Sequence, residues 1–234
     1  MSRQKSLSEI PDDQTRRGSL LDAATAIFAR RGFEAPTMDE LAAACGRDRR
    51  TLYRYFPSKE DLFWEAAERA YRMLERRFRG VADVWESGRV PARGRVRSWI
   101  FAYLGFSLEN PEAFRLVIEG RQRAVAASVA QKAKTGSPIR HQLGHSGAGL
   151  AELDRSVLST LAGLGRQLES EGRCPEGSGD SLLWDVLGVS IALIEFHARY
   201  KGGGTGMPFG TSEGIRRMLE RQISTAFGPE EKQQ

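Results

Sequence analysis

Apolar residues recur with helical spacing along most of the chain. Leu20, Ala24, Ile27 and Phe28 stand at positions i, i+4, i+7 and i+8, and Gly32 follows where a left-handed residue would end a helix. Two more stripes lie further on: Leu150, Leu153, Val157, Leu161, Leu164 and Leu168 on one helix ending near Gly172, and Ile215, Met218, Leu219, Ile223 and Phe227 near the C-terminus. No stretch alternates convincingly like a strand. The pattern therefore predicts an all-α fold.

Two segments, residues 96–108 and 182–196, are apolar on nearly every helical face. A helix on the surface of a soluble protein keeps one polar face towards water. We therefore expect both segments to be buried on several sides.

Residues 36–62 contain three helix starts within 27 positions. Thr37 with Glu40 forms a capping box, Asp48 can cap a second helix, and Ser58 with Asp61 can cap a third. The first two helices are short and are separated by a turn at Gly46. This plan is typical of a helix-turn-helix, whose second helix enters the major groove of DNA.

Charge is concentrated on this second helix. The whole chain has 35 Lys and Arg against 30 Asp and Glu, and 29 of these cations are Arg. Residues 46–56 hold four arginines and a single acid, Asp48. Arg can contact guanine through two hydrogen bonds, and Thr, Tyr and Lys can contact phosphates. We expect double-stranded DNA to contact Thr37, Arg47, Arg49, Arg50, Thr51, Tyr53, Arg54, Tyr55 and Lys59, with the Tyr53 ring buried and its hydroxyl at the DNA surface.

The segment AATAIFARRGFEAPTMDELAAACGRDRRTLYRYFPSKEDLF resembles the N-terminal signature of the TetR family of one-component regulators. The resemblance implies a homodimer with a three-helix DNA-binding head and a larger helical C-terminal domain that binds an effector and dimerises. By position, Thr37, Tyr53 and Lys59 match the family's usual phosphate contacts. Arg47 and Arg50 depart from the family pattern, which has a small apolar residue and commonly a Gly there. The base preference of a relative therefore does not carry over.

We therefore expect the chain to be divided into four regions: a disordered tail over residues 1–14, a helix-turn-helix domain over 15–62, an effector-binding and dimerisation domain over 63–228, and a tail over 229–234. The segments from Ser181 to Tyr200 and from Thr211 to Phe227 are expected to pair with those of a second copy in a four-helix interface. Leu219 is expected in that interface, so that Leu219→Arg would give monomers.

The effector pocket is expected between the two highly apolar segments, because ligand sites in helical bundles lie between helices. Any one of its aromatic residues could equally be core, and a buried histidine could equally be structural. The pocket residues expected are Trp99, Tyr103, Phe106, Trp184, Phe196 and His197. The effector itself is expected to be a small apolar or aromatic molecule that releases a repressor from a palindromic operator.

Enzymatic chemistry is not indicated. Cys45 and Cys174 lack metal-ligand spacing, and the sequence GHSGA at residues 144–148 lacks the strand that precedes a nucleophile elbow, so it is expected to be a loop. His141 and His145 have no carboxylate or thiolate near them in sequence. We expect no cofactor and no metal.

The N-terminus lacks the apolar core of a signal peptide, and the longest apolar stretch, residues 186–194, is too short for a bilayer. We expect a cytoplasmic protein with no membrane partner. Two alternatives to a ligand-responsive repressor remain at this point: a DNA-binding regulator without an effector, and an enzyme that carries a helix-turn-helix-like bundle.

Overall fold

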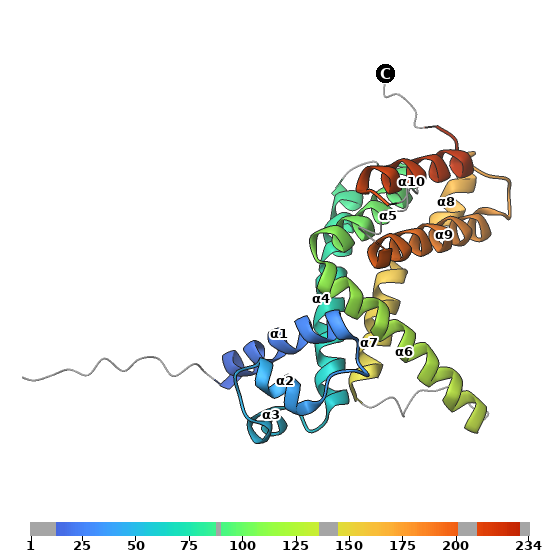
Figure 1. Cartoon of the computed structure of the whole chain (residues 1–234). Coiled ribbons are helices and arrows are strands. Elements are labelled where there is room, and N and C mark those ends of the chain that lie inside the picture. Colours follow the sequence, from blue (N-terminus) through green and yellow to red (C-terminus); the bar gives the residue numbers. More distant parts are fainter. Residues whose placement is uncertain (1–12, 88–89, 136–144, 201–209, 230–234) are drawn as a thin grey trace, which may run out of the picture.

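The computed structural model describes residues 13–87, 90–135, 145–200 and 210–229. These residues form ten α-helices and no strand, as the hydrophobic pattern predicts (Figure 1). The helices are α1 (Asp13–Arg31), α2 (Met38–Ala44), α3 (Arg49–Tyr55), α4 (Lys59–Ser87), α5 (Ala92–Glu109), α6 (Pro111–Thr135), α7 (His145–Ser159), α8 (Leu164–Ser170), α9 (Gly179–Tyr200) and α10 (Ser212–Phe227).

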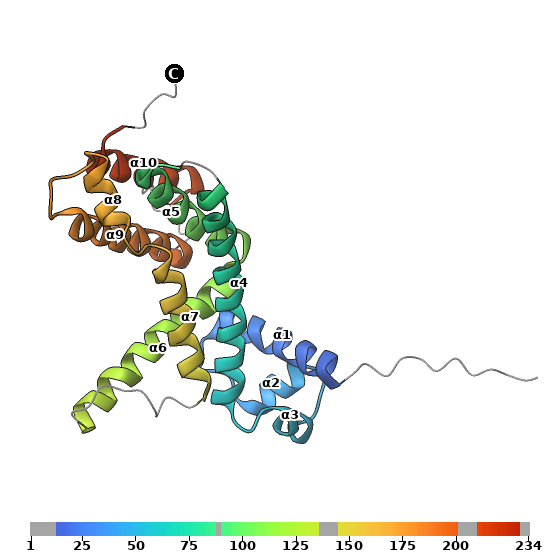
Figure 2. The same ribbon diagram turned by 180° about the vertical axis from the view of Figure 1, so that it is seen from behind.

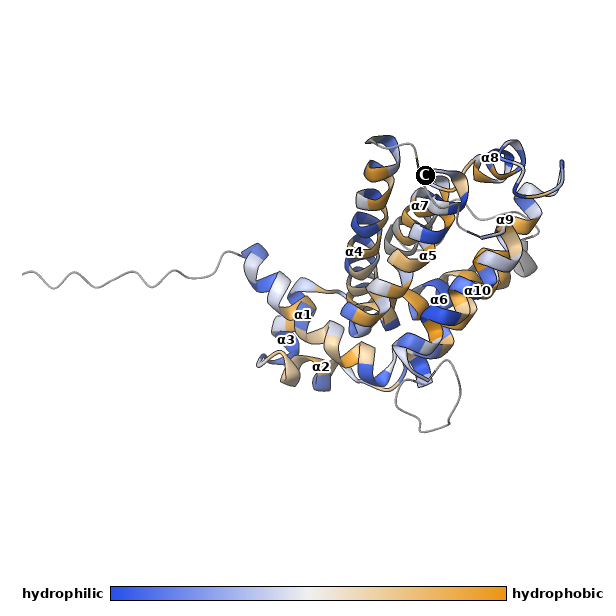
Figure 3. Cartoon of the chain, turned by 90° about the horizontal axis from the view of Figure 1, so that it is seen from above, coloured by the Kyte–Doolittle hydropathy of each residue, from blue (hydrophilic) through white to orange (hydrophobic). Residues whose placement is uncertain are grey.

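Helix α4 runs through the middle of the molecule and joins its two parts. We call α1, α2, α3 and the first turns of α4 the head. At the other end of α4 lie α5, α8, α9 and α10, while α7 runs beside α4, and α6 crosses it and extends away (Figures 1 and 2). Apolar and polar turns alternate along α4 (Figure 3), and Phe63, Ala67, Tyr71, Leu74 and Phe78 are buried at helical spacing. The expected domain border at residues 62 and 63 therefore falls inside one continuous helix.

The helix ends follow the expected local chemistry. Thr37 and Glu40 form the complete capping box, the Asp48 carboxylate accepts the Thr51 amide, and the Ser58 hydroxyl accepts the Asp61 amide. Gly32 has φ +71° and Gly46 has φ +63°. A side chain is rarely tolerated there, because its Cβ would crowd the carbonyl oxygen.

Three boundaries differ from expectation. Helix α1 already begins at Asp13, so the last two residues assigned to the N-terminal tail are helical. The single helix expected up to Gly172 is two helices, because turns at residues 160–163 separate α7 from α8, with Gly163 at φ +79°. Leu161 within this break and Leu164 directly after it are both buried, so the stripe continues across it. Residues 145–148, expected in a loop, form the start of α7, whereas His141 and Gly144 lie outside the described residues.

The two highly apolar segments differ in burial. Helix α5 is buried on several sides, as expected. Helix α9 buries one face, which includes Leu183, Leu187 and Ile194. Four large apolar residues of α9 outside this face are exposed: Trp184 by 49%, Val189 by 52%, Phe196 by 42% and Tyr200 by 60%; we call these four residues the outer face of α9. The expectation of burial on several sides is therefore wrong for α9 within one chain.

The apolar stripe of α10 is used inside the chain. Ile215, Leu219, Ile223 and Phe227 are all buried, and α10 packs against α5 and α9. The placement of Leu219 in an interface between two copies is therefore wrong, since that stripe has no surface left to offer a partner.

Candidate nucleic-acid interface

The short helices α2 and α3 are held by an apolar core that neither could make alone. Leu41 of α2, Leu52 of α3 and Phe56 directly after α3 are completely buried. Beneath them Phe28 of α1 meets Phe63 of α4 edge to face, with 5.4 Å between ring centroids. This core fixes which face of α3 points outward.

Positions four apart on α3 share a face. Leu52 and Phe56 face the core, so Arg50 and Arg54, which are exposed, stand on the opposite side. Arg49 and Tyr53 face α2, and Thr51 and Tyr55 face α1. The helix thus carries a basic outer edge and two polar flanks.

The flank towards α2 is organised around Arg49. Its Nη1 lies 3.1 Å from Oδ2 of Asp39, its Nη2 donates to the Tyr53 hydroxyl at 3.4 Å, and its guanidinium lies 5.3 Å from the centre of the Tyr53 ring. The Tyr53 hydroxyl and the Asp39 charge both raise the pKa of Arg49. The Tyr53 ring is 38% exposed, so the expectation that this ring is buried is wrong.

The flank towards α1 is organised around Tyr55. Arg54 Nη2 donates to the Tyr55 hydroxyl at 2.6 Å, and that hydroxyl donates to Asp13 Oδ1 at 2.6 Å. The end of α3 is therefore tied to the start of α1.

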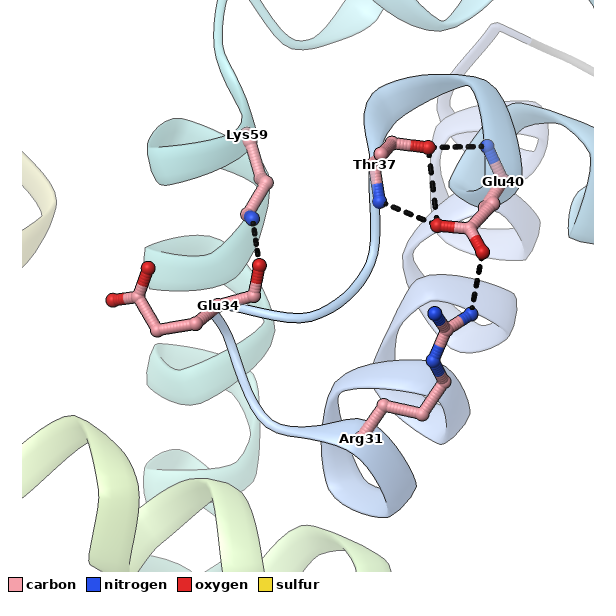
Figure 4. Close-up of polar contacts among 5 residues, drawn as sticks. All are labelled: Arg31, Glu34, Thr37, Glu40 and Lys59. Atoms are coloured by element: carbon pink, nitrogen blue, oxygen red, sulfur yellow. Dashed lines mark hydrogen bonds and ion pairs between the residues drawn. The ribbon is translucent and has the colours of Figure 1, made fainter.

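Thr37 and Lys59 lie beside the same loop (Figure 4). The Thr37 amide donates to Oε2 of Glu40 at 2.8 Å, and Arg31 Nη1 donates to Oε1 of that carboxylate at 2.9 Å. These hydrogen bonds lower the pKa of Glu40 from 4.5 to about 2. Lys59 Nζ donates to the carbonyl oxygen of Glu34 at 3.0 Å. Both residues proposed for phosphate contact are thus positioned by internal hydrogen bonds.

Helix α6 reaches the same loop from the other part of the molecule. Arg123 lies 3.8 Å from the centre of the Phe33 ring, and Nζ of Lys59 lies 4.5 Å from it. Arg123 also pairs with Glu34 at 2.9 Å, and Glu119 accepts the Phe33 amide at 2.8 Å. No local motif marks these α6 residues, because their partners are more than eighty positions away in sequence.

A groove lies between α1 and α3, with a volume of about 430 Å³. We call it the α1–α3 groove. Its lining residues are Thr15, Arg16, Ser19, Leu20, Cys45, Arg47, Thr51, Arg54 and Tyr55. Arg47, Thr51, Arg54 and Tyr55 were expected at a DNA surface, whereas the α1 residues were missed because their first turn directly follows the expected tail.

The six residues expected around an effector fall into two groups. Trp99, Tyr103, Phe106 and His197 are buried, whereas Trp184 and Phe196 belong to the outer face of α9. The placement of Trp184 and Phe196 between α5 and α9 is therefore wrong, because an apolar-all-round sequence does not reveal which side a neighbouring helix covers.

The buried group of aromatic residues is closely packed. Trp99 is stacked on Phe78 with 4.4 Å between ring centroids, and its Nε1 has no hydrogen-bond partner among the described residues. The Tyr103 hydroxyl donates to Oε1 of Glu195 at 3.2 Å, and burial raises the pKa of Tyr103.

Within the described ranges, no group of three or more His, Cys, Asp and Glu side chains is placed to hold a metal ion. Among the helices described, α9 is long and apolar enough to span a membrane, a property that it shares with core helices of soluble proteins. Its inner face packs on α5, α8 and α10.

Residues 20–66 match the family model for bacterial regulatory proteins of the tetR family. The chain is 32% identical over 114 residues to the HTH-type transcriptional activator FasR of Mycolicibacterium smegmatis, a match covering 48% of this chain and 49% of FasR. It is 38% identical over 69 residues to the HTH-type transcriptional repressor KstR2 of Mycobacterium tuberculosis, covering 30% of this chain and 34% of KstR2. The matches thus span about half or less of these relatives.

Solved structures share the fold over nearly the whole chain. The ketosteroid transcriptional regulator KstR2 superposes with a TM-score of 0.63 at 18% identity, covering 92% of this chain and 97% of that one. AibR in complex with isovaleryl coenzyme A and operator DNA superposes with a TM-score of 0.58 at 16% identity, covering 92% and 99%. The match to the tetR family model thus falls on the helix-turn-helix, and the fold that the chain shares with these solved regulators extends well beyond it.

Proposed function

We propose that the protein is a transcriptional regulator that binds a palindromic DNA operator as a homodimer. The observation that carries this proposal is the arrangement of α3, whose apolar residues are buried while Arg50 and Arg54 stand exposed on its outer side. A capped helix presented in this way fits the major groove, which is about 12 Å wide.

Two arginines of α3, Arg49 and Arg50, differ in the contacts that they make in the absence of DNA. Arg50 is exposed, whereas Arg49 is held by Asp39 and Tyr53 and must exchange these contacts to reach a base. Arg50 is therefore the principal base-reading residue, and Arg49 contributes less. Thr37, Tyr53 and Lys59 on the α2 side orient the helix through phosphates.

The outer face of α9 supplies the dimer contact. Val189, Phe196 and Tyr200 share one side of α9, and exposed apolar side chains gathered in this way mark an interaction surface. An isologous contact uses the same patch of both copies. Two heads then reach half-sites about 34–36 Å apart. This interface differs from the four-helix contact expected from sequence, because α10 uses its stripe internally.

An apolar or aromatic small molecule acts as effector between α5 and α9, near Trp99, Tyr103, Phe106 and His197. Support comes from the buried Trp99 Nε1 that lacks a partner within the described part of the chain, and from AibR, which shares the fold and was solved with isovaleryl coenzyme A. A ligand that prefers a different spacing of the heads releases the repressor from DNA, and a coupling of about 1–3 kcal/mol changes affinity about 5- to 150-fold. Its site of action is the cytoplasm.

The test of DNA binding begins with selection of bound duplexes from random and genomic DNA. We expect one palindromic site, and Arg50→Ala should lose about 1–3 kcal/mol at a guanine position and relax preference there. Lys59→Ala should weaken binding to all DNA sequences alike and lower the slope of log affinity against log salt concentration by about one. Arg166→Ala, at an exposed position of α8, is the matched control and should leave binding unchanged. Failure to enrich any duplex would refute the proposal.

The effector is tested separately. Compounds that raise the melting temperature are titrated into the protein with and without the selected operator. Reciprocity requires that operator weaken an effector by the same factor by which the effector weakens operator binding. Equal ligand affinities in both titrations would leave a DNA-binding regulator without effector control.

A further inference from the structure

The α1–α3 groove combines positive charge with hydrogen-bond donors. Arg16 of α1, Arg47 of the turn and Arg54 of α3 contribute three guanidinium groups to its lining. Hydroxyl groups from Thr15, Ser19, Thr51 and Tyr55 complete its polar wall. Arginine forks and hydroxyl donors together are the groups with which proteins hold phosphate oxygens.

Two nearby acids, Asp13 and Asp48, reduce this charge without cancelling it, and the Asp48 carboxylate already accepts the Thr51 amide at 2.7 Å. The Asp13 carboxylate accepts the hydrogen bond from the Tyr55 hydroxyl at 2.6 Å. Against these two negative charges stand the three arginines of the lining, so the local balance remains positive. The neighbouring Arg17 is not part of the site, because it pairs with Glu65 at 2.5 Å and lies over Phe56.

The position of the groove relative to α3 indicates that a phosphate bound there would belong to the DNA backbone. A helix in the major groove has one DNA backbone on each side. Thr37, Tyr53 and Lys59 serve the side towards α2, whereas Thr51 and Tyr55 face α1 and line the groove. The groove therefore lies on the flank of α3 that faces the second backbone.

We infer that the α1–α3 groove binds a backbone phosphate of DNA on the side of the major groove opposite to Thr37 and Lys59, with Arg16 as a phosphate contact supplied by α1. The inference rests on the proposed function, since it presumes that α3 enters the major groove. As the phosphate enters, Arg54 and the Tyr55 hydroxyl exchange part of their mutual and Asp13 hydrogen bonds for bonds to its oxygens.

The experiment uses the full chain and the selected duplex, in which single phosphates are replaced one at a time by neutral methylphosphonates. Arg16→Gln removes the charge and keeps a polar side chain at a partly exposed position. Arg30→Gln makes the same change at an exposed position of α1 outside the groove. Unchanged melting temperatures establish that both variants fold.

We expect one phosphate in each half-site whose neutralisation weakens the wild-type protein but leaves Arg16→Gln unaffected. Loss of a single phosphate contact lowers the slope of log DNA affinity against log salt concentration by about 0.9. Raising the salt from 50 to 200 mM should therefore weaken DNA binding by Arg16→Gln about threefold less than DNA binding by wild type. Arg30→Gln should match wild type in both measurements.

If Arg16→Gln keeps the wild-type salt slope and the wild-type methylphosphonate pattern, the groove is not a DNA phosphate site. Competition by inorganic phosphate at constant ionic strength that depends on Arg16, without any Arg16-dependent position on the duplex, would assign the groove to a free anion and also overturn the inference. If the wild-type protein binds no duplex, the proposed function fails first, and this outcome differs from a bound duplex with an unchanged slope.

Discussion

Helices α5 and α9 look alike in sequence, because both are apolar on nearly every face, yet they end in different environments. Trp99 of α5 is 2% exposed, while Trp184 of α9 is 49% exposed. Helix α5 is surrounded by α4, α6, α8, α9 and α10 of its own chain. Helix α9 keeps exposed apolar residues, which the proposed dimer contact would cover. The difference shows that an apolar sequence specifies burial without specifying the molecule that provides it.

The most damaging change should be a charge placed in α5. Ile100 is completely buried, so Ile100→Arg would bury a guanidinium without a partner and should cost about 4 kcal/mol or more of unfolding free energy. Leu219→Arg on α10 should behave in the same way, because Leu219 is equally buried. Urea unfolding or loss of soluble protein measures this. A folded, monomeric Leu219→Arg protein would restore that residue to the dimer interface.

Removing a tryptophan from each helix gives a matched pair. Trp99→Ala should lose about 3–5 kcal/mol of unfolding free energy, because it leaves a cavity beside Phe78. Trp184→Ala should change the stability of an isolated chain by less than about 1 kcal/mol, since its ring is half exposed. Unfolding must be followed over a range of protein concentrations, because a dimer adds a concentration-dependent term. Equal losses of unfolding free energy in the two variants at low protein concentration would contradict the difference in burial between Trp99 and Trp184.

Charge on the outer face of α9 should separate the copies without unfolding them. Val189→Arg should weaken dimerisation by about 2 kcal/mol or more, which is about thirtyfold, with the far-ultraviolet spectrum unchanged. Thr225→Arg, at an exposed position of α10, is the control and should leave the dimer intact. Sedimentation velocity resolves the two states. A wild-type protein that sediments as a monomer at high concentration would contradict a dimer contact through the outer face of α9.

The smallest expected effect concerns the hydrogen bond that joins α5 to α9. Tyr103→Phe should lose about 1 kcal/mol at neutral pH, because the bond from Tyr103 to Glu195 is removed. Burial raises the pKa of Tyr103 above its ordinary value of 10.0, so the folded state favours the neutral phenol. The stabilisation is complete below pH 10 and is lost as pH rises further. The stability gap between wild type and Tyr103→Phe should therefore narrow above pH 10 in alkaline unfolding curves.

Much of the head could be predicted from sequence because its signals are local. Capping by Thr37 and Asp48 and the positive φ of Gly32 and Gly46 each depend on a few adjacent residues. The break between α7 and α8 was missed, since its short turns keep Leu161 and Leu164 on the same buried side. An apolar stripe records which residues are buried and does not record whether the helix axis continues.

The remaining site features depend on contacts distant in sequence. Arg123 meets Phe33 and Glu34 only because α6 packs against the head, and Arg16 shares a groove with residues of α3 only because the head places α1 beside α3. No spacing rule connects these positions. The exposure of Trp184 and Phe196 likewise depends on which helices cover α9, so their placement around an effector could not be judged from the sequence.

The 29 residues of α4 extend without a break from the head to α5. At about 1.5 Å per residue the helix is about 43 Å long, so tilting it by about 5° about its far end would displace the head by nearly 4 Å. That displacement is close to the spacing of about 3.4 Å between successive base pairs. A rotation too small to disturb the packing around α5 would therefore shift the register of each head along the DNA by one base pair.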